Sequence, residues 1–268
     1  MTMTPHVQPM TTDTVLQAQA RLALSCLDLT SLNDTDSESD LQALCARAQS
    51  AFGPAAAVCV WPRFAALAVR LLPAHIAVAA VANFPDGGSD IAHAVGDTQT
   101  IMDSGAQEID LVLPYSRLIA GDEKAVTQLL RAVRNACLGH TLKVILETGE
   151  LKSDALIARA SELSLLEGAD FLKTSTGKTP VSATLSAART MLRTIAAQPT
   201  DAAPAGFKAS GGIRTVADAA LYFDLVSGML GPFALAPSRL RIGASSLLND
   251  IESVLGGNRR NDAVPTAY

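Results

Sequence analysis

Short runs of consecutive apolar residues alternate along this chain with longer segments in which apolar residues recur every three or four positions. Runs of the first kind are typical of buried parallel strands, and segments of the second kind are typical of helices that cover a sheet. The apolar runs predict eight strands, at residues 25–28, 56–60, 76–83, 108–113, 142–147, 170–174, 206–209 and 239–243. Eight such strands with helices between them predict an α/β fold, a closed (β/α)8 TIM barrel with its active site at the carboxyl ends of the strands.

The helical segments carry ordinary start and stop signals. Residues 35–38 have the Thr-Asp-Ser-Glu spacing of a capping box, and apolar residues follow at helical intervals as far as Ala48. A second helix is predicted over residues 89–104, where Gly105 supplies the stop. We assign these segments to core and caps, with no chemistry of their own.

The length of 268 residues allows one large hydrophobic core, and the apolar segments are spread evenly along it. We therefore expect a single barrel domain over residues 15–255. The polar residues 1–14 lack the basic start and apolar centre of a secretory signal, and we expect them to form a flexible extension. Residues 256–268 are expected to form a flexible tail.

The net charge of −5 gives no general attraction for nucleic acid, so any anion site must be local. No apolar stretch is long enough to cross a membrane. The four cysteines, at positions 26, 45, 59 and 137, lack metal-ligand spacing, so we expect no metal site. We expect them to be buried thiols in a reducing compartment, which indicates a cytoplasmic protein.

Lys173 lies in the predicted strand at residues 170–174, where an ammonium group is costly to desolvate unless chemistry requires it. An amine is nucleophilic only when it is neutral, so burial or a nearby cation must favour loss of its proton. Lys208, at the centre of another predicted strand, can be that cation. Either lysine alone is typical of a solvated side chain, and it is the pair that indicates a site.

Asp110 belongs to the strand at residues 108–113, where period-2 alternation places it on the face opposite Ile109 and Leu111. We expect it to point inward, beside the two lysines, because an isolated buried aspartate would be expensive. In that position it can relay protons. The alternative from the residues alone is a structural ion pair.

Small residues and glycines follow three consecutive late strands. They are Gly177 with Lys178, Gly211 with Gly212, and Gly243 with Ser245 and Ser246. In a barrel, the loops after the late strands and a helix N-terminus commonly hold a phosphate. The three loops together predict a phosphate site, with Lys178 as a countercharge.

These residues resemble deoxyribose-phosphate aldolases, a family of class I aldolases that act through a Schiff base. The resemblance spans nearly the whole chain in order, apart from the N-terminal extension. It rests on Asp28-Leu29-Thr30, on residues 59–64 (Cys-Val-Trp-Pro-Arg-Phe), 83–87 (Asn-Phe-Pro-Asp-Gly), 147–151 (Glu-Thr-Gly-Glu-Leu), 173–178 (Lys-Thr-Ser-Thr-Gly-Lys) and 243–246 (Gly-Ala-Ser-Ser), and on Asp110 with Pro114 and Tyr115 and Lys208 with Gly211 and Gly212. Ala209 and Ser210 replace the Pro-Ala of some members, a difference expected to alter loop rigidity and not chemistry.

By this resemblance, Lys173 forms the Schiff base, Lys208 is the cation that favours its neutral form, and Asp110 relays protons. The resemblance also implies a set of substrate-pocket residues, which are Asp28, Thr30, Cys59, Thr176 and the terminal Tyr268. Cys59 matches a pocket cysteine that is not the nucleophile, and Tyr268 matches a C-terminal tyrosine thought to assist proton transfer.

The implied reaction is the reversible cleavage of 2-deoxy-D-ribose 5-phosphate to D-glyceraldehyde 3-phosphate and acetaldehyde, without a cofactor or metal. The expected partners are a small sugar phosphate and aldehydes, and the expected assembly is a homodimer. Two alternatives remain open. One is a Schiff-base aldolase on the same barrel for another phosphorylated aldehyde, and the other is a barrel that binds a sugar phosphate without catalysis.

Overall fold

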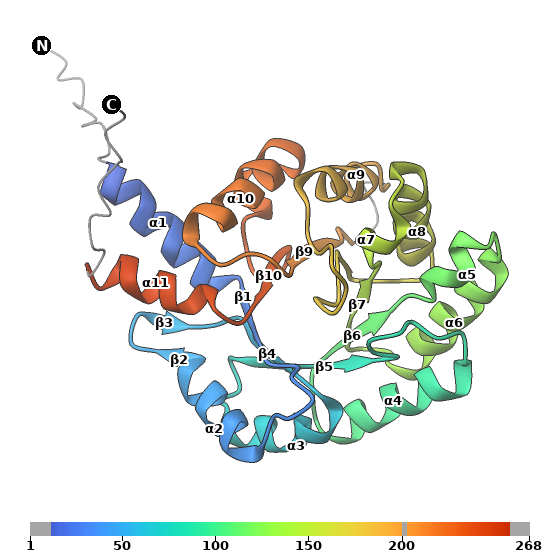
Figure 1. Ribbon diagram of the computed structural model, residues 1–268, viewed down its shortest axis with the longest axis horizontal. Coiled ribbons are helices and arrows are strands. Elements are labelled where there is room, and N and C mark those ends of the chain that lie inside the picture. The colour runs from blue at the N-terminus through green and yellow to red at the C-terminus, as the bar shows by residue number, and fades with distance from the viewer. Residues whose placement is uncertain (1–11, 200–202, 258–268) are drawn as a thin grey trace, which may run out of the picture.

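Eight parallel strands close into a barrel in the computed structural model, which describes residues 12–199 and 203–257 (Figure 1). The barrel strands are β1 (Leu27–Thr30), β4 (Ala57–Val60), β5 (Ala77–Ala82), β6 (Glu108–Val112), β7 (Thr141–Ile145), β8 (Phe171–Lys173), β9 (Gly206–Ser210) and β10 (Leu240–Ala244). They pair in that order, and β10 pairs with β1. The predicted (β/α)8 barrel is confirmed, and no predicted strand boundary is wrong by more than two residues.

Helices surround the barrel on its outside (Figure 1). They are α1 (Thr12–Ser25), α2 (Glu38–Arg47), α3 (Pro62–Leu71), α4 (Ile91–Asp103), α5 (Tyr115–Ile119), α6 (Glu123–Ala136), α7 (Thr148–Leu151), α8 (Asp154–Leu166), α9 (Leu185–Ala196), α10 (Val216–Leu230), the 3₁₀ turn η1 (Pro232–Ala234) and α11 (Leu247–Leu255). A short hairpin of β2 (Gln49–Ser50) and β3 (Gly53–Pro54) follows α2. No helix in residues 12–199 and 203–257 is long and apolar enough to cross a membrane.

Two sequence predictions are corrected at the N-terminal side. Helix α1 begins at Thr12, so residues 12–14 belong to a helix and not to the polar extension. The capping box of α2 lies two residues later than expected, because Ser37 is the N-cap and its hydroxyl accepts from the backbone N–H of Asp40, whose carboxylate accepts from the N–H of Ser37. Asp36, which lies inside the predicted capping box, bonds to the preceding loop: its carboxylate accepts from the hydroxyl of Ser31.

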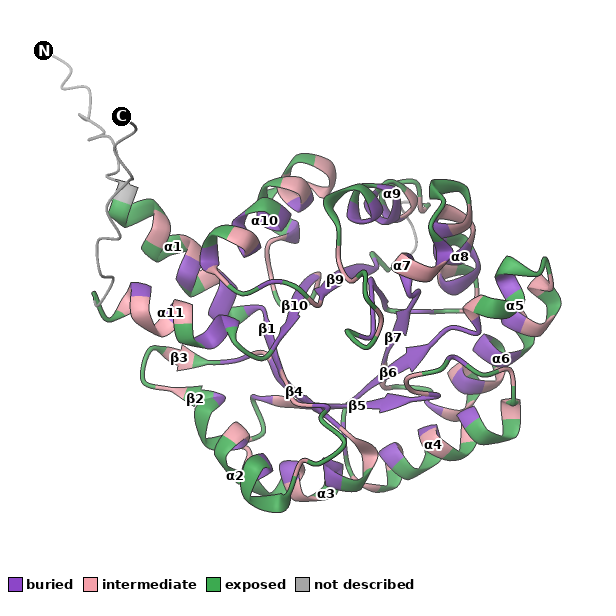
Figure 2. Ribbon diagram, viewed as in Figure 1, coloured by how far each residue is buried: buried purple, intermediate pink, exposed green. Residues whose placement is uncertain are grey.

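The strands separate an outer apolar core from an inner charged space. Outward-facing strand residues such as Ile109, Leu111 and Phe207 are fully buried against the helices, and Figure 2 shows the barrel strands buried along most of their length. The alternate positions point into the barrel, which holds most of the buried charged residues among those that the structure describes. A small apolar cluster of Leu32 and Cys59 with two β5 residues covers part of the inner wall. The fold therefore concentrates polar chemistry inside the barrel.

Candidate active site

Strand register brings the charged side chains to neighbouring positions inside the barrel. Asp110 on β6 pairs with Lys143 on β7, and Lys173 on β8 pairs with Lys208 on β9. Lys208 in turn pairs with Arg241 on β10. Paired residues of neighbouring strands point to the same side of the sheet, so these side chains all face the interior.

The carboxylate of Asp110 joins the three lysines. Its Oδ2 atom accepts from the Nζ of Lys173 at 2.8 Å and from the Nζ of Lys208 at 2.8 Å. Its Oδ1 atom accepts from the Nζ of Lys143, also at 2.8 Å. The Nζ atoms of Lys173 and Lys208 are therefore no more than 5.6 Å apart, which is twice 2.8 Å. The structure thus brings the three predicted catalytic residues into direct contact and adds a third lysine.

Asp28 and Glu108 complete the acidic part of the cluster. Asp28 accepts from Lys208 and, at 2.6 Å, from the guanidinium of Arg241. Glu108 lies 2.5 Å from the Nζ of Lys143 and 2.7 Å from a nitrogen of Arg241. Asp28 therefore belongs to the buried ion network rather than to the wall of the open cavity described below.

The ionisation of the cluster follows from these contacts. Burial alone raises the pKa of a carboxyl group and lowers that of an amine. Opposite charges outweigh burial here: the three lysines hold the pKa of Asp110 well below its ordinary value. For Lys208, Asp110 and Asp28 outweigh burial and raise the pKa above its ordinary value. For Lys143, the charges of Asp110, Glu108 and Asp28 outweigh burial and raise the pKa above its ordinary value. These groups stay charged at neutral pH.

Cys59 lies at the edge of the cluster, fully buried on β4. Its thiol points to Asp110 with a sulfur-to-Oδ2 distance of 3.7 Å. Burial, followed by the nearby Asp110 charge, raises the pKa of this thiol above its ordinary value. A protonated thiol is a poor nucleophile. All four cysteines are buried as free thiols.

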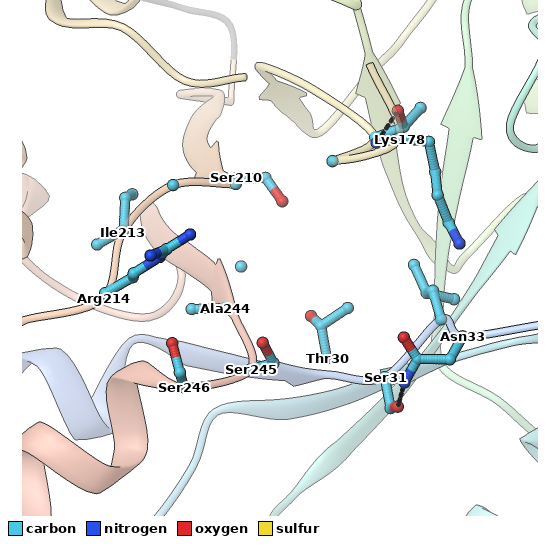
Figure 3. Close-up of a pocket in the computed structure, with 16 residues that line it drawn as sticks. Thr30, Ser31, Asn33, Lys178, Ser210, Ile213, Arg214, Ala244, Ser245 and Ser246 are labelled. Carbon is cyan, nitrogen blue, oxygen red and sulfur yellow. Dashed lines mark hydrogen bonds between the residues drawn. The ribbon is translucent and has the colours of Figure 1, made fainter. Parts of the chain in front are cut away.

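A cavity of about 330 Å³ opens at the carboxyl ends of β1, β8, β9 and β10 (Figure 3). It brings together every predicted phosphate-site residue, which are Gly177, Lys178, Gly211, Gly212, Gly243, Ser245 and Ser246. Two of the predicted pocket residues, Thr30 and Thr176, also line it. Its wall further includes Arg214, which enters from the side opposite Lys178 (Figure 3).

The cavity is suited to an anion. Helix α11 begins directly after Ser246, whose side chain makes no capping hydrogen bond. The N–H of Asn249 donates to the carbonyl oxygen of Ser246, and the N–H groups before it are not capped by that side chain, so they face the cavity end of the helix as potential donors. Gly211 has a φ of 85° and Gly243 packs so closely that an added Cβ would lie 2.5 Å from the hydroxyl of Ser210. These glycines let the loops approach one another closely. Lys178 and Arg214 supply positive charge.

Glu147 fixes the β8 loop beneath that cavity. It is fully buried at the end of β7, with a left-handed backbone conformation at φ 54°. Its carboxylate accepts from the backbone N–H of Thr176 at 3.2 Å, from the hydroxyl of Thr176 at 2.5 Å and from the hydroxyl of Thr179 at 3.2 Å. Thr176 in turn accepts from the N–H of Lys178. Glu147 is therefore a positioning residue for the loop.

We expect Glu147→Ala to loosen this loop and to lower the free energy of unfolding by about 1–3 kcal/mol, since buried donors lose their acceptor. Denaturant unfolding of the variant measures the change. Glu150→Ala, three residues further along the same turn, is the matched control and should cost less. An equal loss in the two variants would contradict the assigned role.

Five residues of the site were not predicted from the sequence. For four of them, the sequence holds a pattern that could have indicated the residue. Lys143, Glu108 and Arg241 each lie within a predicted strand, as Lys173 does. Arg214 follows Gly211 and Gly212 by only two residues. The fifth, Glu147, was found only as part of a motif, because its role depends on a loop that is distant in sequence. Tyr268, predicted in the pocket, lies outside the described residues.

The fold and the buried lysine cluster define a (β/α)8 barrel enzyme. Over residues 22–253 the chain matches the family described as DeoC/LacD family aldolase, and it belongs to that family. It is 49% identical over 241 residues to a deoxyribose-phosphate aldolase from Agrobacterium fabrum, covering 89% of this chain and 92% of that protein.

Two solved structures extend this similarity. A crystal structure of a candidate deoxyribose-phosphate aldolase from Coccidioides immitis is 31% identical with a TM-score of 0.74, covering 86% of this chain and 85% of that chain. The deoxyribose phosphate aldolase from Aeropyrum pernix, described as having a unique tetrameric structure, is 26% identical with a TM-score of 0.68, covering 91% of this chain and 98% of that chain.

Proposed function

We propose that this aldolase reversibly cleaves 2-deoxy-D-ribose 5-phosphate to D-glyceraldehyde 3-phosphate and acetaldehyde through a Schiff base on Lys173. The observation that carries the proposal is a buried lysine cluster directly beneath an anion-suited cavity at the carboxyl ends of the strands. The relative from Agrobacterium fabrum, a deoxyribose-phosphate aldolase, supports the choice of substrate.

The contacts of the lysines support Lys173 as the nucleophile. The Nζ of Lys143 lies within 4 Å of three carboxylates, and the Nζ of Lys208 lies within 4 Å of two. The Nζ of Lys173 lies within 4 Å of one carboxylate, that of Asp110. The cluster holds four cations and three carboxylates, so with every group ionised its charge is +1. A neutral Lys173 leaves the cluster balanced, which is the state that nucleophilic attack requires.

The reaction then follows in three stages. The Nζ of Lys173 adds to C1 of the open-chain sugar, and loss of water gives an iminium. Removal of the C3 hydroxyl proton breaks the C2–C3 bond, the electron pair passes to the iminium nitrogen, and glyceraldehyde 3-phosphate leaves. The enamine that remains takes a proton at C2, and water releases acetaldehyde and the free lysine. Asp110, through water, moves the protons to and from O3 and C2.

The test of this function is cleavage itself. Purified enzyme incubated with 2-deoxyribose 5-phosphate should release acetaldehyde and glyceraldehyde 3-phosphate in equal amounts. A panel of other phosphorylated sugars and aldehydes separates the alternatives. Faster turnover of another phosphorylated substrate would indicate a different Schiff-base aldolase, and tight binding without cleavage of any of them would indicate a binding protein.

We propose that the cavity holds the 5-phosphate and expect Ser246→Glu to weaken kcat/KM for the phosphorylated sugar by roughly 100-fold, because the new carboxylate repels the anion at the start of α11. Cleavage of unphosphorylated 2-deoxyribose should change far less, since its reacting carbons do not depend on the anion site. Steady-state kinetics on both sugars measures the difference.

Ser246→Ala is the matched control, because it removes the hydroxyl without adding charge. Position 246 is preferable to Gly212, where a φ of 82° would strain any side chain. Circular dichroism confirms that the variants are folded. Equal proportional losses on the two sugars would mean that Ser246→Glu damages the pocket in general, and the phosphate assignment would be withdrawn.

We further propose that the enzyme is a cytoplasmic homodimer and that Tyr268 assists proton transfer. The four free, buried cysteines support a reducing compartment. Large exposed apolar side chains, among them Phe233 at 96% exposure and Leu166 at 77%, support an interface between copies. The Aeropyrum pernix relative is tetrameric, so size measurement in solution is required for this chain.

A further inference from the structure

We propose that Glu108 and Arg241, which do not contact Lys173, set the protonation state of that lysine by fixing the total charge of the buried cluster. They act from the end of the barrel opposite the substrate cavity. The inference rests on the proposed function, because it concerns the lysine proposed as nucleophile. It assigns a positioning role to a pair of residues that the reaction steps above do not use.

The pair lies at the amino-terminal end of the barrel interior. Glu108 is the first residue of β6, and Arg241 is the second residue of β10. Two nitrogens of Arg241 contact the Glu108 carboxylate, at 2.7 and 3.2 Å, and its Nε donates to the carbonyl oxygen of Pro237 at 2.6 Å. Arg241 also lines a cavity of about 620 Å³ that includes Ala56, directly before β4, and Ala77, the first residue of β5. The pair therefore does not line the cavity proposed for substrate.

Each member of the pair also binds a group that contacts the reactive centre. Arg241 donates to Asp28, and Asp28 accepts from Lys208. Glu108 contacts Lys143, and Lys143 contacts Asp110. Asp110 contacts Lys173 directly, and Lys208 binds the same Oδ2 atom of Asp110. Removal of either member therefore changes the charge around the reactive lysine, to which it is linked by a chain of short, buried contacts.

The groups around Lys173 that carry or can gain a charge lie on six other strands of the barrel. They are Asp28 on β1, Glu108 and Asp110 on β6, Lys143 on β7, Lys208 on β9 and Arg241 on β10, and the thiol of Cys59 on β4 also faces the cluster. Without Lys173 these groups are three cations and three carboxylates. The surroundings of a neutral Lys173 are thus electrically balanced, and Glu108 and Arg241 contribute one charge of each sign.

Single substitutions should therefore move the activity profile in opposite directions. Glu108→Gln leaves an excess cation, which favours loss of the proton from Lys173 and moves the acidic limb of kcat/KM to lower pH. Arg241→Met leaves an excess carboxylate, which favours the ammonium form and moves the same limb to higher pH. A unit charge roughly 8 Å away at an effective dielectric of about 20 gives a displacement of about 1–1.5 pH units.

The double variant Glu108→Gln/Arg241→Met is the matched control, because it removes one charge of each sign. Its acidic limb should return to within about half a pH unit of the wild-type position, whatever the loss in kcat. A merely structural role for the pair predicts something else: the double variant would be at least as impaired as either single variant, and the limb would not return.

The experiment measures kcat/KM for 2-deoxyribose 5-phosphate against pH for the full-length wild type, the two single variants and the double variant, with borohydride trapping of the lysine adduct at each pH as a second readout. Opposite shifts in the single variants and recovery in the double variant are expected. Shifts in the same direction, or no shift, would overturn the inference. If one single variant fails to fold, the other single variant and the double variant still distinguish these outcomes.

Failure of the proposed function has a different signature. If the wild type cleaves no substrate and forms no reducible adduct at any pH, the function itself is wrong. If the wild type reacts at Lys173 but the variants lack the opposite shifts, only the role of Glu108 and Arg241 is wrong.

Discussion

Lys173→Met is expected to reduce turnover of 2-deoxyribose 5-phosphate by roughly 10⁴-fold or more, and to abolish the borohydride-reducible adduct, because the proposed nucleophile is removed. The fold should survive. Methionine fills similar space, and the cluster that remains holds three cations and three carboxylates, so no excess charge is buried. Turnover, adduct mass and thermal unfolding are the three measurements.

Lys178→Met is the matched control for Lys173→Met, since it removes a partly exposed lysine from the loop that follows β8. It should retain the adduct while weakening the affinity for the phosphorylated sugar. An adduct on Lys143, Lys178 or Lys208 in the wild-type enzyme would refute the assignment of Lys173, as would normal turnover in Lys173→Met.

Lys208→Leu is expected to lower activity at pH 7 by roughly 100-fold and to move the acidic limb of the activity profile to higher pH by about two units. A cation about 6 Å from the reactive amine, at an effective dielectric of about 20, contributes about 2.8 kcal/mol in favour of its neutral form. The contacts give the same sign. Without Lys208, Asp110 and Asp28 lose a shared cation, so the charge of Lys173 is needed to balance them.

Lys124→Leu, on the exposed surface of α6, controls for a general effect of losing one positive charge and should leave the profile in place. Rates must be measured across the whole pH range, because a stability loss in Lys208→Leu lowers the plateau without moving the limb. A limb that stays at the wild-type pH, with near-normal activity, would show that burial and not Lys208 controls the reactive amine.

The barrel could be predicted from the sequence because each strand is a short apolar run, and parallel strands buried on both sides leave that signal wherever they occur. Boundaries were harder to place where a helix runs directly into a strand. Helix α1 continues through Ser25, so β1 begins at Leu27 rather than at residue 25. The capping box of α2 was misplaced for another reason: two overlapping sets of polar residues, at 35–38 and at 37–40, each have the spacing of a capping box.

The site was predicted in part, because buried charges were followed only on the strands of Lys173, Lys208 and Asp110. Lys143 and Arg241 were missed, although Arg241 also precedes a glycine-bearing loop, at Gly243. The partners of each charge could not be predicted, since Asp110 and Lys208 are brought together by strand register and barrel closure. The network is a property of the closed barrel and not of any one segment.

The most direct test of the Schiff-base mechanism is the mass of the wild-type protein after reduction with borohydride in the presence of acetaldehyde. The mechanism predicts a single two-carbon adduct, which peptide mapping assigns to Lys173, and its absence in Lys173→Met. No adduct, or a two-carbon adduct that maps to another lysine while Lys173 remains unmodified, would contradict it.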